Sequence, residues 1–166
     1  MRAIRRVTGR IGIRVVAAIL IKIAAVAPIQ AVDTAVTFSS TIAGICSLLI
    51  GTNGIIAANV DYTELSSENL TGVPGVVTAI TTSGGYSLSA LAPGAFTAAP
   101  VGGDTDVTFT SNYSGIGTTI IPETDGATPT PLNLGLTIVT VDLTATKSSG
   151  IFPAGNYTAD VTVRCE

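Results

Sequence analysis

The chain has 166 residues, of which 46% are hydrophobic, so it is long enough for one domain with a sizeable core. Histidine is absent, which removes the commonest general base and the commonest transition-metal ligand, and there are only two cysteines. A Ser-His-Asp or Cys-His nucleophile cannot be built from such a chain, nor an ordinary zinc site, so we expect neither an enzyme nor a cofactor.

The first thirty-one residues have the layout of a secretory signal peptide: arginines, then an apolar stretch, then small residues. Cleavage after Ala27 would leave Pro28 at the new N-terminus, which signal peptidases tolerate poorly, so we expect cleavage after Ala31. An uncleaved membrane anchor is the alternative. Lys22 argues against it, because each flanking apolar run is far shorter than the roughly 20 residues of a spanning helix. The predicted location is the periplasm, the cell surface or the extracellular space.

Removal of this leader changes the charge. Lys147 and Arg164 then remain against eleven acidic residues, which gives a net charge near −9 (2 − 11). A nucleic-acid footprint needs clustered Lys and Arg to neutralise phosphates, so neither DNA nor RNA is expected as a partner.

The remaining chain is expected to be all-β. No segment after residue 32 has a sustained helical period, and short runs of Val, Ile, Thr, Phe and Tyr alternate with Gly, Pro, Asn and Ser. This pattern is typical of an antiparallel sandwich or barrel. The expected strands are 34–50, 56–62, 75–82, 86–91, 105–112, 117–121, 132–145 and 156–165.

The first expected strand is longer than the usual five or six residues. Its apolar alternation continues from Val36 to Ile50. Either one strand bends at Gly44, or an N-terminal extension over residues 32–43 precedes a sandwich domain over residues 44–166.

The two cysteines, Cys46 and Cys165, both remain after cleavage. An isolated pair in an oxidising compartment most often forms a disulfide, so we predict a Cys46–Cys165 bridge, with two buried thiols or an intermolecular bridge as alternatives. The bridge would close a loop of more than a hundred residues, which is worth about 4 to 5 kcal/mol in the chain-entropy model.

Two connections are predicted from turn residues. Gly84-Gly85 would form a hairpin turn between the third and fourth strands. The segment from Ser148 to Gly155 would turn the seventh strand into the closing strand, so that residues 132–165 form one long hairpin.

The acidic residues offer one weak candidate site. Asp104 and Asp106 on an expected strand would place two carboxylates on one face, which could serve a hard cation such as calcium. Since a calcium loop usually gathers more than two oxygen ligands, a solvated strand edge is the favoured interpretation and no metal site is predicted.

The seventh expected strand changes face partway along. Its apolar positions slip by one residue at Ile138-Val139. In a half-buried strand such a slip predicts a bulge or a crossover between sheets.

The closing segment "FPAGNYTADVTVRCE" alternates regularly, with Tyr157, Ala159, Val161, Val163 and Cys165 on one side. Together with the alternating N-terminal arm and the first-strand cysteine in "IAGICSLLIG", it resembles the subunits of bacterial chaperone-usher pili, including the spore coat protein U-like branch. In that family a Pro-Ala-Gly-x-Tyr turn commonly leads into the last strand. It is matched here by Pro153, Ala154, Gly155 and Tyr157.

The resemblance implies an immunoglobulin-like β-sandwich that lacks its final strand. A periplasmic chaperone would fill the resulting groove first, and the arm of the next subunit would fill it afterwards, by strand addition at a sheet edge. Other copies of the chain or related subunits and an outer-membrane usher are the further implied partners. The implied donor residues are Val36, Phe38, Ser40 and Ile42. The implied acceptor residues are Tyr157, Val161 and Val163.

One cysteine departs from the family. The second cysteine of pilins usually lies mid-chain, whereas here it is Cys165 on the last strand. A bridge at this place either fixes the floor of the groove or shuts it.

The leading hypothesis from the resemblance is an exported structural or adhesive subunit that assembles by strand addition. The alternative is a monomeric exported binding module of the same fold class, whose glycan-binding version is weakened by the shortage of aromatic rings.

Overall fold

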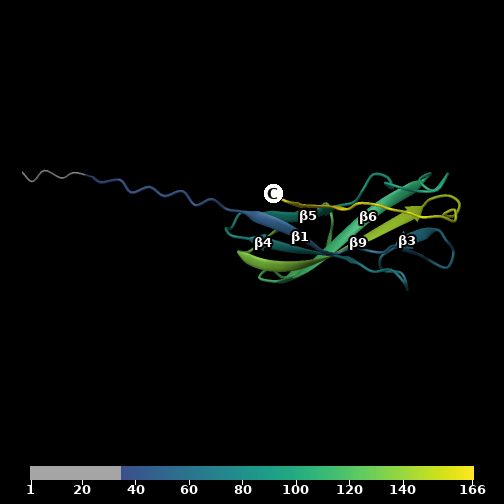
Figure 1. The fold of residues 1–166 in the computed structure, drawn as a ribbon, viewed down its shortest axis with the longest axis horizontal. Coiled ribbons are helices and arrows are strands. Elements are labelled where there is room, and N and C mark those ends of the chain that lie inside the picture. Colours follow the sequence, from purple (N-terminus) through teal and green to yellow (C-terminus); the bar gives the residue numbers. More distant parts are fainter. Residues whose placement is uncertain (1–34) are drawn as a thin grey trace, which may run out of the picture. The chain divides into compact units, whose positions relative to one another are not determined.

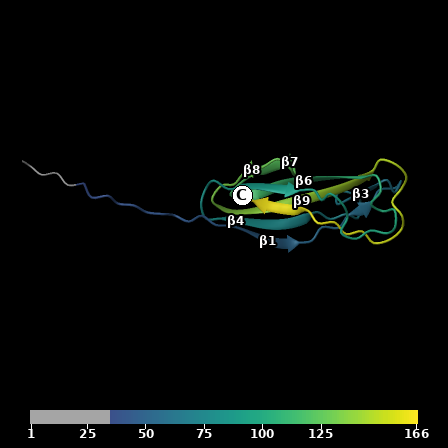
Figure 2. The ribbon, with the colours of Figure 1, turned by 90° about the horizontal axis from the view of Figure 1, so that it is seen from above.

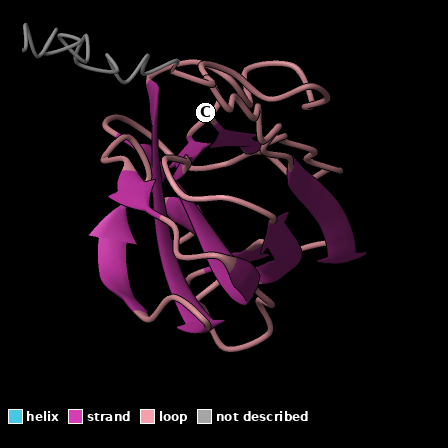
Figure 3. Cartoon of the chain, turned by 90° about the vertical axis from the view of Figure 1, so that its left-hand side faces the viewer, coloured by secondary structure: helices cyan, strands magenta, loops and turns pink. Residues whose placement is uncertain are grey.

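The computed structural model describes residues 35–166, which form strands and loops without a helix (Figures 1 and 3). The predicted leader and the first residues of the arm lie outside this range. None of the described residues belongs to a helix that could cross a membrane. Residues 40–166 make one compact unit. The strands are β1 (Cys46–Thr52), β2 (Ala57–Ala58), β3 (Glu64–Ser66), β4 (Gly75–Thr81), β5 (Ser87–Leu91), β6 (Val107–Gly117), β7 (Ile121–Asp125), β8 (Thr130–Pro131), β9 (Gly135–Lys147) and β10 (Thr162–Cys165).

The strands form two antiparallel sheets of seven and three strands. In the larger sheet β9 pairs with β4 and β3 along one edge and with β6 along the other (Figure 2). Strand β1 continues the sheet beyond β4, β2 continues it beyond β3, and β7 continues it beyond β6. The smaller sheet has the order β10-β5-β8. Strands β1 and β10 are therefore both edge strands.

The two sheets pack face to face, so the fold is a β-sandwich, as the sequence predicted. Leu88 and Ala90 of β5 meet Val139 of β9 and Tyr113 of β6 in one core cluster, and all four are 0% exposed. The Tyr113 hydroxyl reaches from the larger sheet to the carbonyl of Leu88 at 2.9 Å, and it also lies 2.7 Å from the carbonyl of Thr128. A buried tyrosine with its hydroxyl bonded in this way joins the sheets by packing and by polar contacts.

A second cluster lies farther along β9, around Ala145. Its aromatic rings meet edge to face, with Phe96 at the centre, 4.8 Å from Phe109 and 5.0 Å from Tyr157. The buried Lys147 lies over the ring of Phe152 at 5.4 Å, and its ammonium group donates to loop carbonyls.

Both predicted hairpins are wrong. Strand β4 belongs to the larger sheet and β5 to the smaller one, so Gly84-Gly85 connects two sheets. Residues 132–165 are not one hairpin either, because β9 pairs with β4, β3 and β6 while β10 pairs with β5. Turn residues show where the chain turns but not which strand it will meet.

The predicted bulge or crossover at Ile138-Val139 is also wrong. Strand β9 keeps an unbroken register with β4 and with β6 across these residues. Its odd-numbered residues from Thr137 onwards face the core, while Leu136 and Ile138 remain on the outer face, 45% and 41% exposed. The apparent slip arises because apolar residues occupy both faces of one continuous strand.

Candidate functional site

A groove of about 850 Å³ runs between β1 and the C-terminal segment, residues 157–163. Leu48, Ile50 and Thr52 of β1 line one side, and the floor includes Val77, Val141 and Leu143 of the larger sheet. The opposite side includes the three residues that the sequence suggested as acceptors, Tyr157, Val161 and Val163.

The apolar side chains that face this groove are incompletely covered. Along the C-terminal segment the odd-numbered residues from Tyr157 to Cys165 are half-buried and the even-numbered ones are exposed, as the sequence alternation predicted. Across the groove Ile50 is 77% exposed. Large apolar side chains on the interior side of a sheet are normally covered by a neighbouring element, but within residues 35–166 no element covers those of the groove.

The edge of β1 has unpaired backbone groups on the groove side. The Thr82 amide donates to the Ile45 carbonyl at 3.0 Å, which sets the phase of the antiparallel ladder with β4. Hydrogen-bonded and non-hydrogen-bonded pairs alternate in such a ladder, so the N–H and C=O groups of Leu48 and Ile50 point away from β4. They form a free edge.

The C-terminal segment has a matching free edge. Ser87 and Glu166 exchange two backbone hydrogen bonds of 2.7 and 3.0 Å, which sets the phase of the β5–β10 ladder. The backbone groups of Val163 therefore point away from β5. Within residues 35–166, the backbone of residues 159–161 makes no hydrogen bond, so this edge continues toward Tyr157.

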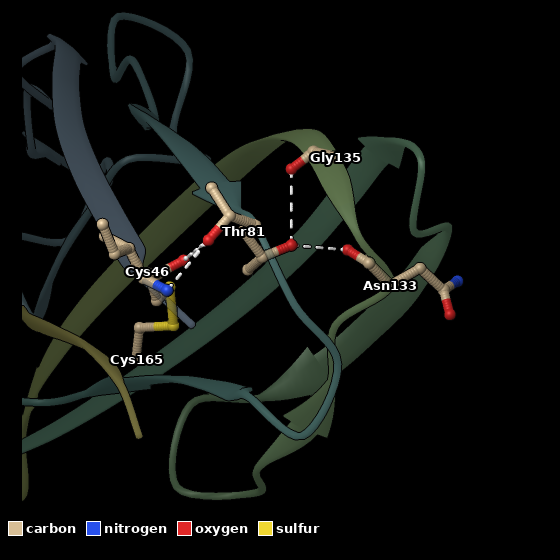
Figure 4. Close-up of a disulfide and its surroundings, with 7 residues drawn as sticks. Cys46, Thr81, Asn133, Gly135 and Cys165 are labelled. Atoms are coloured by element: carbon tan, nitrogen blue, oxygen red, sulfur yellow. Dashed lines mark hydrogen bonds between the residues drawn. A yellow bond between two sulfur atoms is a disulfide. The ribbon is translucent and has the colours of Figure 1, made fainter. Parts of the chain in front are cut away.

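The predicted disulfide is present and joins these two edges at one end of the groove (Figure 4). Cys46 begins β1, Cys165 ends β10, and their Cα atoms are 6.3 Å apart. Beside the bridge the Thr81 hydroxyl donates to the Asn133 carbonyl at 2.7 Å and anchors the neighbouring strand. The bridge holds the two edges together at this end, while the groove continues beyond it.

The suggested donor residues lie on residues 35–45, which belong to no strand. Val36, Phe38 and Ile42 are 71%, 91% and 84% exposed, and Ser40 is exposed as well. The expected strand 34–50 thus begins only at Cys46. No charged residue occurs between Ala35 and Ile45.

The two aspartates do not share a strand face, contrary to the sequence-based expectation. Both precede β6 in a turn, where Asp106 has a φ of +57° and the Asp104 carboxylate accepts from the Phe96 amide at 3.1 Å. Among residues 35–166 there is no group of three His, Cys, Asp or Glu residues that could hold a metal ion.

A second cavity of about 660 Å³, which the sequence did not suggest, adjoins the end of the groove away from the disulfide. It shares Ile56 and Tyr157 with the groove and is lined further by Tyr62 and Phe152. The Tyr157 hydroxyl donates to the Pro153 carbonyl at 2.7 Å, and burial raises the pKa of this phenol. The "FPAGNY" run could have indicated this cavity from the sequence, because its two aromatic residues flank a turn.

No protein-family model, no curated protein and no solved structure matches the chain.

Proposed function

We propose that the protein is an exported pilin-like surface subunit, with an immunoglobulin-like sandwich that is one strand short, and that it assembles by strand addition. The arm of one copy, residues 32–43, enters the groove of another copy. The observation that carries the proposal is the pair of free edges, at Leu48 and Ile50 and at Val163, that face an uncovered apolar groove.

The arm suits the groove in chemistry. Its even-numbered residues Val36, Phe38 and Ile42 are apolar and exposed, and burial of each is worth about 1.5–3 kcal/mol. Backbone hydrogen bonds to both free edges would add affinity, as in other strand additions. The costs of association and of ordering the arm are subtracted from this gain.

The apolar groove of the unassembled subunit must also be covered. A periplasmic chaperone that lends a strand to the groove, and an usher that exchanges it for the next arm, are the partners that this proposal implies. An apolar groove left open would otherwise be a site of uncontrolled edge pairing.

The test compares arm variants of the exported chain by size-exclusion chromatography and by gel electrophoresis after mild denaturation. We expect ladders from the unaltered chain and monomers after deletion of residues 32–43. Phe38→Asp should also abolish the ladders, whereas Ser39→Asp, on the other face of the inserted strand, should leave them. Monomers from the unaltered chain, or ladders from the deletion variant, would contradict strand addition and favour a monomeric binding module.

A further inference from the structure

The disulfide divides the groove into a closed end and an open end. A strand that lies between two others needs about 4.7–4.9 Å on each side, so its neighbours must be about 9.5 Å apart. The Cα atoms of Cys46 and Cys165 are only 6.3 Å apart. No strand fits between them.

The opposite end has no such obstacle. Strand β1 leads away from the bridge toward Thr52, and the C-terminal segment reaches the bridge from Tyr157, so the two edges run in opposite directions. Around Ile56 and Tyr157 the groove continues into the second cavity. This end is open.

We propose that the Cys46–Cys165 disulfide is an end-stop that fixes the direction and the register of the strand bound in the groove. The inference rests on the proposed function and names the partner as the arm of a second copy. It assigns to the bridge a positioning role beyond the stability of the fold.

The direction follows from the tether of the arm. Ile45 already pairs with Thr82 in its own domain, so only Ala43 and Gly44 separate Ile42 from that domain. This link spans about 10 Å at most. A tethered end at the closed end would force the donor domain against the bridge, whereas a tethered end at the open end meets no obstacle. The arm therefore runs antiparallel to the C-terminal segment, with Val36 nearest the bridge.

The direction also decides the type of assembly. The arm leaves its own domain at the disulfide end, because β1 begins with Cys46. It enters the next domain at the open end. Such a head-to-tail contact is heterologous and generates open chains, whereas arms entering at the disulfide end would favour closed, exchanged dimers.

The register follows from the stop and from the apolar pattern of the arm. In every register the arm leaves the groove where it reaches the bridge, so the residues before Val36 lie outside the groove. Insertion two residues deeper would push Val36 out as well and would place Ser40 beside Val161. A shift two residues outward would put Ser40 beside Tyr157 and leave Val163 without an apolar partner. The register between these extremes pairs each apolar arm residue with an apolar groove residue: Val36 with Val163, Phe38 with Val161 and Ile42 with Tyr157.

The test places a photoreactive phenylalanine analogue in the arm of the exported chain and maps the cross-linked residues by mass spectrometry. With the bridge intact, a probe at position 38 should label the surroundings of Val161, a probe at 36 those of Val163, and a probe at 42 those of Tyr157. The reverse order, or labelling around Cys165 by the probe at 38, would overturn the end-stop. These probes replace exposed arm residues, so the sandwich itself is unaltered.

The second part of the test removes the bridge with Cys46→Ala and Cys165→Ala together. We expect the probe at position 38 to label a wider window that extends toward residue 165. An unchanged window in the folded double variant would overturn the end-stop while leaving strand addition intact. If no probe cross-links a second copy, the proposed function fails as well, so the two failures are distinguishable.

Discussion

Two regions of the interior differ in how far their apolar side chains are covered. Around Tyr113 and Leu88 the side chains between the sheets are 0% exposed, whereas at the groove Ile50 faces the same interior and is 77% exposed. Burial alternates along β6, whereas in β1 it passes from half-buried residues at Cys46–Leu48 to exposed ones from Leu49 onwards. The open region therefore leaves apolar side chains uncovered that a packed neighbouring element would bury.

A charged side chain placed in the groove should have the largest effect on assembly. Ile50→Asp should lower assembly by at least about 100-fold, since a carboxylate buried without a partner costs several kcal/mol, while the fold of the unassembled subunit changes little. Leu49→Asp is the matched control, because Leu49 is 54% exposed on the opposite face of the same strand. Equal losses in both variants, measured by sedimentation velocity, would mean that the groove face has no special role.

Truncation of an apolar side chain should separate the two regions in the unassembled subunit. Leu88→Ala should lower the free energy of unfolding by about 2–5 kcal/mol, because the side chain is fully buried. Val163→Ala should cost less than about 1 kcal/mol, because Val163 is only half-buried. Urea unfolding of the arm-deleted chain measures both, and similar costs would show that the groove is already covered.

Loss of the tyrosine hydroxyl should weaken the closed region by a smaller amount. Tyr113→Phe keeps the ring but removes the hydroxyl that lies within hydrogen-bond distance of the Leu88 and Thr128 carbonyls, which should lower the free energy of unfolding by about 1–3 kcal/mol. Tyr62→Phe is the control, since Tyr62 is 58% exposed. A cost for Tyr113→Phe no larger than that of the control would contradict a polar link between the sheets.

The smallest expected effect concerns pH at the edge of the groove. Burial raises the pKa of the Tyr157 phenol above its usual value of 10.0. Above about pH 10 the unfolded chain therefore loses this proton before the folded chain does, so the free energy of unfolding falls as the pH rises. Tyr157→Phe should reduce the loss of stability between pH 8 and pH 11 in urea unfolding. An identical loss in the variant would argue against a desolvated phenol.

Local patterns predicted much of the groove from the sequence. The alternation from Tyr157 to Cys165 gave the core-facing residues of the C-terminal segment, and two isolated cysteines in a chain expected to be exported predicted their bridge. The alternation follows from the two-residue period of a strand, and the bridge follows from the expected oxidising compartment. A single sequence indicates both.

Pairing between distant strands could not be predicted in the same way. Nothing local to Gly84-Gly85 indicates that the flanking strands belong to different sheets. Leu136 and Ile138 look like core residues, although they lie on the outer face of β9. The second cavity depends on Tyr62 and Phe152, which are far apart in sequence and meet only in the fold.

Amide hydrogen exchange at the groove edges tests strand addition most directly. In the arm-deleted chain the amides of Leu48, Ile50 and Val163 should exchange rapidly, because they point into the groove, while the Leu49 amide is already bonded to β4. In the assembled protein these three amides should become protected and Leu49 should change little. If all three still exchange rapidly in the assembled protein, no strand has been added at this site.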